Sequence, residues 1–142
     1  MAEAATIQVD IVSAEGEIFS GPATEVIAPG SQGDLGIYPR HAPLLSLLRA
    51  GEVRVKTADG AEHFFFVGGG ALEVQPHKVT VLADTALRAK DLDEAAAVAA
   101  KQRAEEALQD KGGHVTQAEA LAELSRTIAQ LKMIERLRKQ RN

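Results

Sequence analysis

Apolar and polar residues alternate over short segments between residues 6 and 83. In the segment TIQVDIV, the apolar residues Ile7, Val9 and Ile11 are separated by Gln8 and Asp10. A period of two is typical of a strand that buries one of its faces. The segments EVRVKT, HFFFV, ALEV and VTVLA have the same character. This part of the chain is therefore predicted to form strands.

Turn residues separate these segments at short intervals. The sequence Ala58-Asp59-Gly60-Ala61 lies between EVRVKT and HFFFV, and Asp-Gly favours a tight hairpin turn because it tolerates left-handed backbone angles. Many short strands with frequent turns predict an antiparallel sandwich or barrel. Further turns are expected at residues 75–78, Glu15–Gly16, Ser20–Gly21–Pro22 and Pro29–Gly30.

The spacing of apolar residues becomes helical after Asp84. Asp91, with Glu94 three positions later, predicts a helix N-cap, and the glycines of Lys111-Gly112-Gly113 predict the end of that helix near Asp110. Thr116, with Glu119 three positions later, predicts the cap of a second helix. Because the connection is short, the two helices form an antiparallel hairpin or lie end to end. The second helix has a predicted apolar stripe of Leu121, Leu124, Ile128, Leu131, Ile134 and Leu137.

The first helix has little apolar volume to bury. Its large apolar residues are Leu92, Val98 and Leu108, and the rest of its apolar face is alanine. A buried leucine contributes about 1.5–3 kcal/mol, whereas an alanine methyl contributes about 0.8 kcal/mol at most. One hypothesis is therefore a hairpin whose docked and undocked states differ little in free energy. The alternative is a static helical appendage.

Charge is distributed unevenly along the chain. Residues 1–86 carry 11 acidic and 5 basic residues, a net charge of −6, and residues 87–142 carry 9 acidic and 11 basic residues, a net charge of +2. The sum is the −4 of the whole chain, which argues against a nucleic-acid partner. The basic C-terminal end instead favours an acidic protein surface, with a solvated helix end as the alternative.

Several classes of site are disfavoured by composition. The chain has no cysteine, so it has no disulfide, thiolate metal site or cysteine nucleophile. The longest apolar-plus-glycine run, FFFVGGGAL at 64–72, is too short to cross a bilayer as a helix. Residues 1–20 lack the pattern of a signal peptide. We therefore expect no direct membrane insertion, and any membrane association is expected to be made through another protein.

Histidine and glycine motifs give no clear catalytic or metal site. The four histidines, His41, His63, His77 and His114, are not spaced as metal ligands. The run at 68–70 is Gly-Gly-Gly without the following Lys-Ser/Thr of a phosphate loop. It is predicted to be a bulge or a point where two backbones approach closely.

The segment GSQGDLGIYPRHAPLL, residues 30–45, combines turn residues with Asp34, Arg40 and His41. This polar trio could provide an acid and a base, so a free-standing β-sandwich enzyme or ligand-binding domain using the Asp34–His41 loop is one hypothesis. The other is a turn-rich loop that serves as a contact surface.

Two segments resemble one protein family. GDLGIYPRHAPLL and VGGGALEVQPHKVTVLADTALRAKDLDEA are similar to the epsilon subunit of the bacterial rotary (F-type) ATP synthase. The resemblance implies a β + α fold class. An N-terminal antiparallel β-sandwich, residues 1–86, would bind the gamma subunit and the c ring. A C-terminal two-helix antiparallel hairpin, residues 87–142, would be regulatory.

The implied function is that of a non-catalytic rotor subunit. It would couple gamma to the c ring during ATP synthesis, and its helices would extend toward the alpha/beta catalytic head to inhibit ATP hydrolysis. Its location would be peripheral, at the cytoplasmic face of the bacterial inner membrane. The implied c-ring-facing loop is Ser31, Gln32, Gly33, Asp34 and His41, with Gln32 where many relatives have an acid. The implied basic residues facing the beta subunit are Arg126, Lys132, Arg136, Arg138 and Lys139.

Some members of this family bind ATP on the folded hairpin. The matching stretch here begins Leu92-Asp93, but Ala96 replaces the arginine of the family pattern. Arg103 and Arg126 remain as phosphate partners for a weak site, yet a bidentate donor is lost. We expect no cofactor and weak or absent ATP binding, and a nucleotide sensor remains a third hypothesis.

Overall fold

The computed structural model describes residues 5–110, 112, 113 and 115–141. The chain divides into two compact units, Met1–Ala89 and Lys90–Asn142. The change from strand to helix pattern in the sequence predicts a border after residue 86. The first unit extends three residues further because strand β8 (Ala86–Arg88) pairs with β6. Lys111 and His114 lie outside the described residues.

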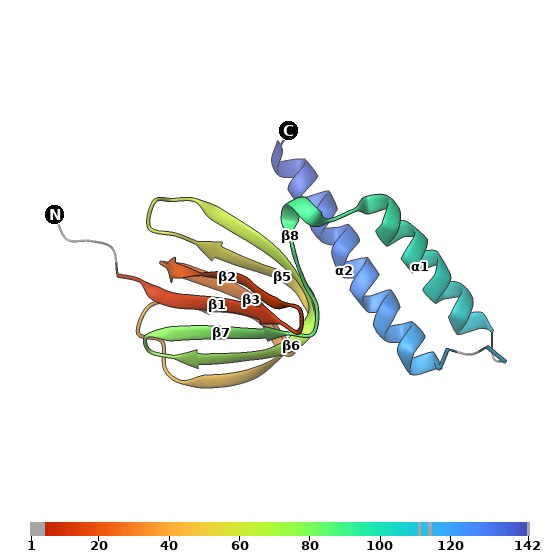
Figure 1. Cartoon of the computed structure of the whole chain (residues 1–142), viewed down its shortest axis with the longest axis horizontal. Helices are drawn as coiled ribbons and strands as arrows, with labels where there is room; N and C mark the ends of the chain where they lie inside the picture. Colours follow the sequence, from red (N-terminus) through yellow and green to blue (C-terminus); the bar gives the residue numbers. More distant parts are fainter. Residues whose placement is uncertain (1–4, 111, 114, 142) are drawn as a thin grey trace. The chain divides into compact units, whose positions relative to one another are not determined.

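The first unit is built from strands that pair into one continuous sheet (Figure 1). The sheet order is β2-β1-β7-β6-β5-β3-β4, and β8 pairs with β6. The other strands are β1 (Ile7–Ser13), β2 (Gly16–Ala23), β3 (Glu25–Gly30), β4 (Gly33–Ile37), β5 (Leu44–Lys56), β6 (Glu62–Gln75) and β7 (Lys78–Ala83).

Strands β5 and β6 run through both layers of the sandwich. They pair along their whole length, from Leu44 opposite Val74 to Lys56 opposite Glu62. The C-terminal half of β6 carries β7, β1 and β2, whereas β5 carries β3 between Lys56 and Leu48, and β3 carries β4. The sheet therefore folds over on itself, and the predicted antiparallel β-sandwich is confirmed. One pair departs from the antiparallel pattern, because β1 and β7 are parallel.

The core lies between the two layers and follows the alternation seen in the sequence. Ile7, Val9 and Ile11 have no exposed surface, whereas Gln8 and Asp10 are half-buried on the outer face. The same alternation places the inward residues of β5, β6 and β7 in one cluster, which includes Val53, Val55, Phe65, Val67, Leu72, Val74, Val79 and Val81.

The glycine run at 68–70 marks the bend of β6 between the two layers. Gly69 and Gly70 have φ angles of 105° and 136°, which L-residues rarely adopt. A Cβ atom on Gly70 would lie 2.1 Å from the Leu82 carbonyl oxygen. The predicted close approach of two backbones is therefore confirmed, and backbone hydrogen bonds join Gly68 to Thr85 and Asp84 to Gly69.

Two turn predictions and one loop prediction are wrong. Pro29–Gly30 lies at the end of β3, opposite Asp34 and Gly33. Ser20–Gly21–Pro22 lies inside β2, where Pro22 is opposite Gln8. Strand β2 is at the edge of the sheet order, and an edge strand tolerates the missing N–H of proline. Residues 30–45 are not one loop either, because β4 forms within them and pairs with β3.

The second unit begins with one 3-10 turn, Ala89–Asp91, followed by α1 (Glu94–Gln109) and α2 (Gln117–Arg141). The N-cap of α1 is Asp93, not Asp91 as predicted, and its side chain accepts a hydrogen bond from the Ala96 amide at 3.1 Å. Asp91 cannot cap α1 because it lies in the 3-10 turn. Asp110, rather than a glycine, caps the C-terminus and accepts from the Gly112 amide.

The two helices pack as an antiparallel hairpin (Figure 1). The predicted cap of α2 is confirmed, since Thr116 Oγ1 accepts from the Glu119 amide at 3.1 Å. The predicted stripe is wrong at its start, because Leu121 is 56% exposed. The buried positions carry mostly small side chains: Ala97, Ala104, Ala120, Thr127 and Met133. No helix in the described ranges is long and apolar enough to span a membrane.

Candidate partner-binding surfaces

The tip of the β3–β4 hairpin presents four of the predicted site residues together. Ser31 and Gln32 form the turn between Gly30 and Gly33, and residues 31–34 are all exposed. Gly33 has a φ of 136°, and a Cβ on Gly30 would lie 2.6 Å from the Gly33 carbonyl oxygen. The turn therefore requires glycine on both sides. It presents a narrow, exposed polar tip.

Arg49, on β5, holds this hairpin and was missed by the sequence analysis. Its guanidinium donates Nη1 to the Gly30 carbonyl and Nη2 to Asp34, with 2.5 Å between Nη2 and Oδ1. The Ser31 amide donates to the Leu47 carbonyl at 2.8 Å. Alternation along β5 indicates an outward Arg49. Its partners depend on the pairing of β3 with β5, which leaves no local signal in the sequence.

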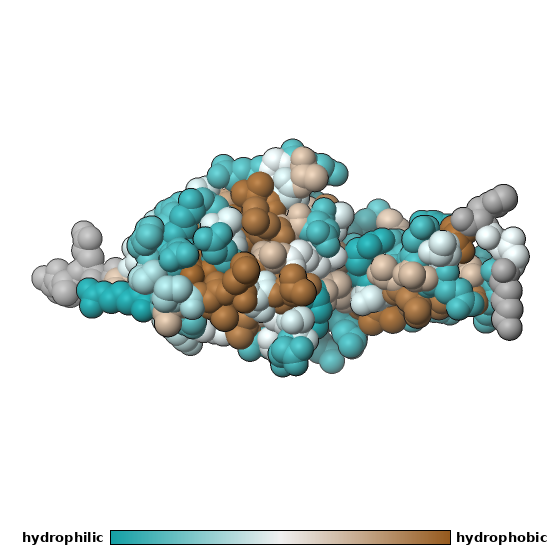
Figure 2. All heavy atoms as spheres, turned by 90° about the horizontal axis from the view of Figure 1, so that it is seen from below, coloured by the Kyte–Doolittle hydropathy of each residue, from teal (hydrophilic) through white to brown (hydrophobic). Residues whose placement is uncertain are grey.

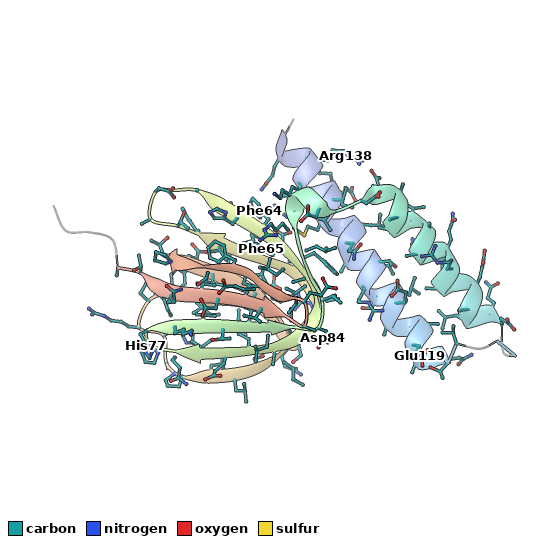
Figure 3. All side chains as sticks on the ribbon, in the orientation of Figure 1. Phe64, Phe65, His77, Asp84, Glu119 and Arg138 are labelled. Carbon is teal, nitrogen blue, oxygen red and sulfur yellow. The ribbon has the colours of Figure 1, made fainter. Side chains whose placement is uncertain are left out.

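His41 does not join the hairpin tip. Strand β4 separates them, and five residues of strand span roughly 17 Å. The amide of Arg40 donates to the Pro76 carbonyl at 2.9 Å, which places this turn beside His77. His77 and Asp84 lie at opposite ends of the sandwich unit (Figure 3).

The separation of the hairpin tip, with Asp34, from His41 removes the geometry that the acid–base hypothesis needs. The Asp34 carboxylate is bound by Arg49, and the Nδ1 of His41 lies 2.7 Å from the Ala42 carbonyl oxygen. Among the described residues, no group of three or more His, Asp or Glu side chains could hold a metal ion. These residues therefore form no arrangement for acid–base chemistry on a shared substrate.

An apolar patch lies on the outer face of the sandwich, formed by Leu45, Leu47 and Leu82. These side chains are 76%, 68% and 50% exposed, respectively. Strand register aligns Leu47 with Ala71 and Ala71 with Leu82, so the patch crosses β5, β6 and β7. Leu47 and Leu82 also line a shallow, open hollow of ≈ 460 Å³. Figure 2 shows apolar residues gathered on one face of the sandwich unit.

A polar network lies on the same outer face, over β1, β2 and β7. Asp10 accepts hydrogen bonds from Ser20 Oγ at 2.7 Å and Gln8 Nε2 at 3.1 Å, and it pairs with Lys78 at 3.0 Å. The Ser20 hydroxyl, and then Lys78, lower the pKa of Asp10 below 3.8. The network stabilises strand pairing, because each of its members lies on a strand adjacent to another.

The predicted basic residues of α2 lie between Arg126 and Lys139. Arg126 pairs with Glu123, Arg138 with Glu94, and Lys139 with Glu135 at 3.4 Å. Lys132 is exposed and Arg136 is half-buried. An acidic partner would therefore have to exchange with existing intramolecular ion pairs. Such exposed pairs are weak enough to be exchanged.

The four residues predicted for a weak ATP site lie on α1, on α2 and in the segment before α1. Leu92 and Asp93 precede α1, and Arg103 lies ten positions beyond Asp93, roughly 15 Å along the helix axis. The Asp93 carboxylate is engaged by the Ala96 amide. Arg126, on α2, is paired with Glu123. The weak ATP site stays a prediction, in which Asp93 and Arg126 would have to exchange these partners for the nucleotide.

Comparison with known proteins gives matches over nearly the whole chain. One family model matches residues 6–89. Its description is "ATP synthase, Delta/Epsilon chain, beta-sandwich domain". The model for the ATP synthase, Delta/Epsilon chain, long alpha-helix domain matches residues 90–135. The chain is 62% identical to the ATP synthase epsilon chain of Nitrosococcus oceani, over 96% of this chain and 97% of that protein. It is 60% identical to the epsilon chain of Alkalilimnicola ehrlichii, over 94% and 96%.

Solved structures share the fold at low sequence identity. A chain in the cryo-EM structure of the Euglena gracilis mitochondrial ATP synthase, which includes the c-ring, aligns with a TM-score of 0.76. The identity is 16%, over 91% of this chain and 81% of that one. A chain of the Tetrahymena thermophila mitochondrial ATP synthase central stalk and c-ring aligns with a TM-score of 0.58, at 14% identity, over 96% and 98%.

Proposed function

Because this chain belongs to the ATP synthase delta/epsilon chain family, we propose that it is a non-catalytic rotor subunit. In this role it joins the gamma subunit to the c ring during ATP synthesis and restrains ATP hydrolysis through its helical hairpin. Its site of action is the cytoplasmic face of the bacterial inner membrane, where it is held by its partner subunits.

The apolar patch is the observation that best supports a permanent protein partner. Leu45, Leu47 and Leu82 expose large apolar surface on one face, and such clusters mark interaction sites in folded proteins. We assign this patch to gamma. The neighbouring Ser31–Gln32 tip, which is bonded to Leu47, is assigned to the polar loops of the c ring. His41 is not part of that contact in this proposal, because it lies beyond the far end of β4.

Co-purification with gamma tests this assignment. The full chain should form a stable complex with gamma, and Leu47→Asp should weaken it because a charge would be buried in the interface. Leu87→Asp, at a side chain 36% exposed on β8, is the matched control and should leave binding intact. If the chain does not bind gamma, the rotor assignment fails and a free-standing binding domain becomes the better hypothesis.

The inhibitory role rests on the second unit. Its buried seam is largely alanine, and three of its predicted basic residues, Arg126, Arg138 and Lys139, are in exchangeable surface pairs. Both features suit a hairpin that opens to reach the acidic surface of the catalytic head. Truncation after Ala89 should keep the sandwich and gamma binding, because Arg88 and its hydrogen bond to the Ile18 carbonyl are retained.

Hydrolysis by the assembled complex should rise after this truncation. Charge reversal at Arg136 and Lys139 should weaken inhibition more at low salt than at high salt, because exposed charges are screened. Unchanged hydrolysis after truncation, under all conditions of salt and nucleotide, would remove the inhibitory role while leaving the gamma contact in place.

We expect the hairpin not to act as a nucleotide sensor. Ala96 supplies no guanidinium, and Arg126 is paired with Glu123. Isothermal titration of the full chain with ATP should therefore give no binding in the micromolar range. The variant Ala96→Arg, which restores the arginine of the family pattern, provides the comparison. Micromolar affinity in the unmodified chain would establish the sensor hypothesis.

A further inference from the structure

Arg49 connects the hairpin tip to the body of the sandwich. We propose that Arg49 is a positioning residue that fixes the Ser31–Gln32 tip and neutralises Asp34, so that the tip meets the c ring through uncharged hydrogen-bonding groups. The proposal rests on the proposed function, in which this tip faces the ring. It adds a residue that positions the contact and the chemistry by which the contact is made.

Three contacts anchor the tip, and Arg49 makes two of them. Its Nη1 donates to the carbonyl of Gly30, the last residue of β3, and its Nη2 binds Asp34 in β4. The third contact is the Ser31 amide, which donates to Leu47 in β5 at 2.8 Å. The Arg49 guanidinium therefore joins both strands of the hairpin to β5. Arg49 lies two residues after Leu47, whose carbonyl accepts from the Ser31 amide.

The register of the sheet explains why this position needs a clamp. Pairing of β3 with β5 is irregular between Ile27 and Gly30, so the regular ladder weakens as β3 approaches the tip. A planar guanidinium supplies two donors in a fixed geometry, which suits two acceptors on different strands. A lysine at this position would keep the positive charge but would lack the two N–H donors held in a fixed plane.

The ion pair also determines the charge of the tip. Ser31, Gln32 and Gly33 are uncharged, and the carboxylate of Asp34 lies 2.5 Å from Arg49 Nη2. The side chains of Arg49 and Asp34 are 48% and 60% exposed, so the pair lies at the surface where a partner would meet it. With both residues present, the tip offers hydrogen-bonding groups and no net charge.

Hydrogen exchange on the full chain tests the positioning directly. The Ser31 amide should exchange about fivefold faster in Arg49→Ala, the effect of losing roughly one net hydrogen bond. Arg49→Lys should show most of the same increase. Arg54→Ala is the matched control, because Arg54 lies on the same strand and pairs with Glu52 at 3.3 Å. Equal Ser31 exchange in wild type and Arg49→Ala overturns the proposal.

Coupling in the assembled complex tests the consequence for the partner contact. The ratio of ATP-driven proton pumping to ATP hydrolysis should be insensitive to salt in wild type. In Arg49→Ala it should fall and become salt-dependent, because Asp34 is then an unpaired surface charge that salt screens. In the double variant Arg49→Ala/Asp34→Asn the ratio should stay low but lose its salt dependence, a pattern that simple loss of structure would not give.

The two experiments separate the clamp from the proposed function. Faster Ser31 exchange with unchanged coupling at every salt concentration overturns the role of Arg49 in partner contact and the assignment of the tip to the ring. Retention of gamma by all variants would show that the stalk assignment itself stands. Loss of gamma binding in Arg49→Ala, with Arg54→Ala unaffected, also overturns the proposal, because the tip would then serve gamma.

Discussion

Arg138, in the last turn of α2, donates its Nη2 to the carboxylate of Glu94, the first residue of α1. The pair joins the two helices, whereas Arg126–Glu123 and Lys139–Glu135 lie within α2. It therefore bears on the free energy of the hairpin as a packed pair of helices. Both side chains are at least half exposed, so the contribution is about 0.2–1 kcal/mol.

Breaking this pair should loosen the hairpin without unfolding the sandwich. In Glu94→Gln, amides of the second unit should exchange faster by a factor of about 1.4–5, while sandwich amides should be unchanged. Lys139→Gln is the control, because it removes a pair that lies within one helix. The double variant Glu94→Arg/Arg138→Glu should restore slow exchange, and its failure to do so would contradict a pairwise origin.

Glu94→Gln also separates the effect of the Arg138–Glu94 pair from the effect of the basic residues of α2 in assembled complexes. Glu94→Gln leaves all five basic residues in place and destabilises only the compact hairpin, so inhibition of hydrolysis should increase. Arg138→Gln removes both the Arg138–Glu94 pair and one basic residue. Inhibition of hydrolysis should therefore be weaker in Arg138→Gln than in Glu94→Gln. Steady-state hydrolysis at low salt measures both. Equal inhibition in the two variants would mean that Arg138 does not contact the catalytic head.

Gly70 should be among the least replaceable residues of the sandwich. Its φ is 136°, and an added Cβ would lie 2.1 Å from the Leu82 carbonyl oxygen and 2.9 Å from Ala83 Cα. Both obstacles are backbone atoms, so Gly70→Ala should cost about 2–4 kcal/mol of unfolding free energy. Gly36→Ala is the control, because its Cβ would meet only Tyr38 at 3.7 Å. Urea unfolding of both variants gives the comparison, and a cost below that of Gly36→Ala would contradict this account.

Period-two alternation predicted the sandwich well because it reports burial of one face, and burial is what the core requires. Ile7, Val9 and Ile11 are all fully buried, as the pattern indicates. The turn prediction at Pro22 is wrong because proline, which is favoured in turns, is also tolerated in an edge strand. Whether a strand lies at the edge depends on the order of the whole sheet. Asp91 misled because two aspartates two positions apart compete for one cap, and only Asp93 has its oxygen on the Ala96 amide.

The candidate site was harder to predict than the fold. Proximity in sequence suggested that Asp34 and His41 act together, but Asp34 lies near the start of β4 and His41 lies beyond its end. Arg49, fifteen residues from Asp34, binds it through the pairing of β3 with β5. Side chains brought together by non-local strand pairing leave no local pattern in one sequence.

Asp10 should make stability depend on pH in the acid range. Its pKa is lowered by the Ser20 hydroxyl and by Lys78, so the folded state binds fewer protons than the unfolded state. The stabilisation is complete above the unfolded value of 3.8 and is lost as pH falls through the lower folded pKa. Asp10→Asn should therefore lose about 1–2 kcal/mol at neutral pH.

Denaturant unfolding of wild type and Asp10→Asn between neutral and strongly acid pH checks this effect. The difference in unfolding free energy between the two should shrink as the carboxylate is protonated. In Ser20→Ala the pKa of Asp10, followed by NMR, should rise because its main hydrogen-bond donor is gone. A difference that is constant across the acid range would contradict the assignment.

Arg40 carries backbone strain that a substitution can relieve. Arg40 is the only described non-glycine residue with a positive φ, which is 67°. This conformation costs an L-residue about 1–2 kcal/mol. Arg40→Gly removes that cost but adds about 0.4–1 kcal/mol of unfolded-state entropy, so a net gain of about 0.5–1 kcal/mol is expected. Arg40→Ala keeps the strain and should give no gain, and Arg40→Val should be destabilising because β-branched residues tolerate this region least. Thermal unfolding ranks the three variants, and a Gly variant no more stable than the Ala variant would show that the turn, held by the Pro76 carbonyl, is not strained.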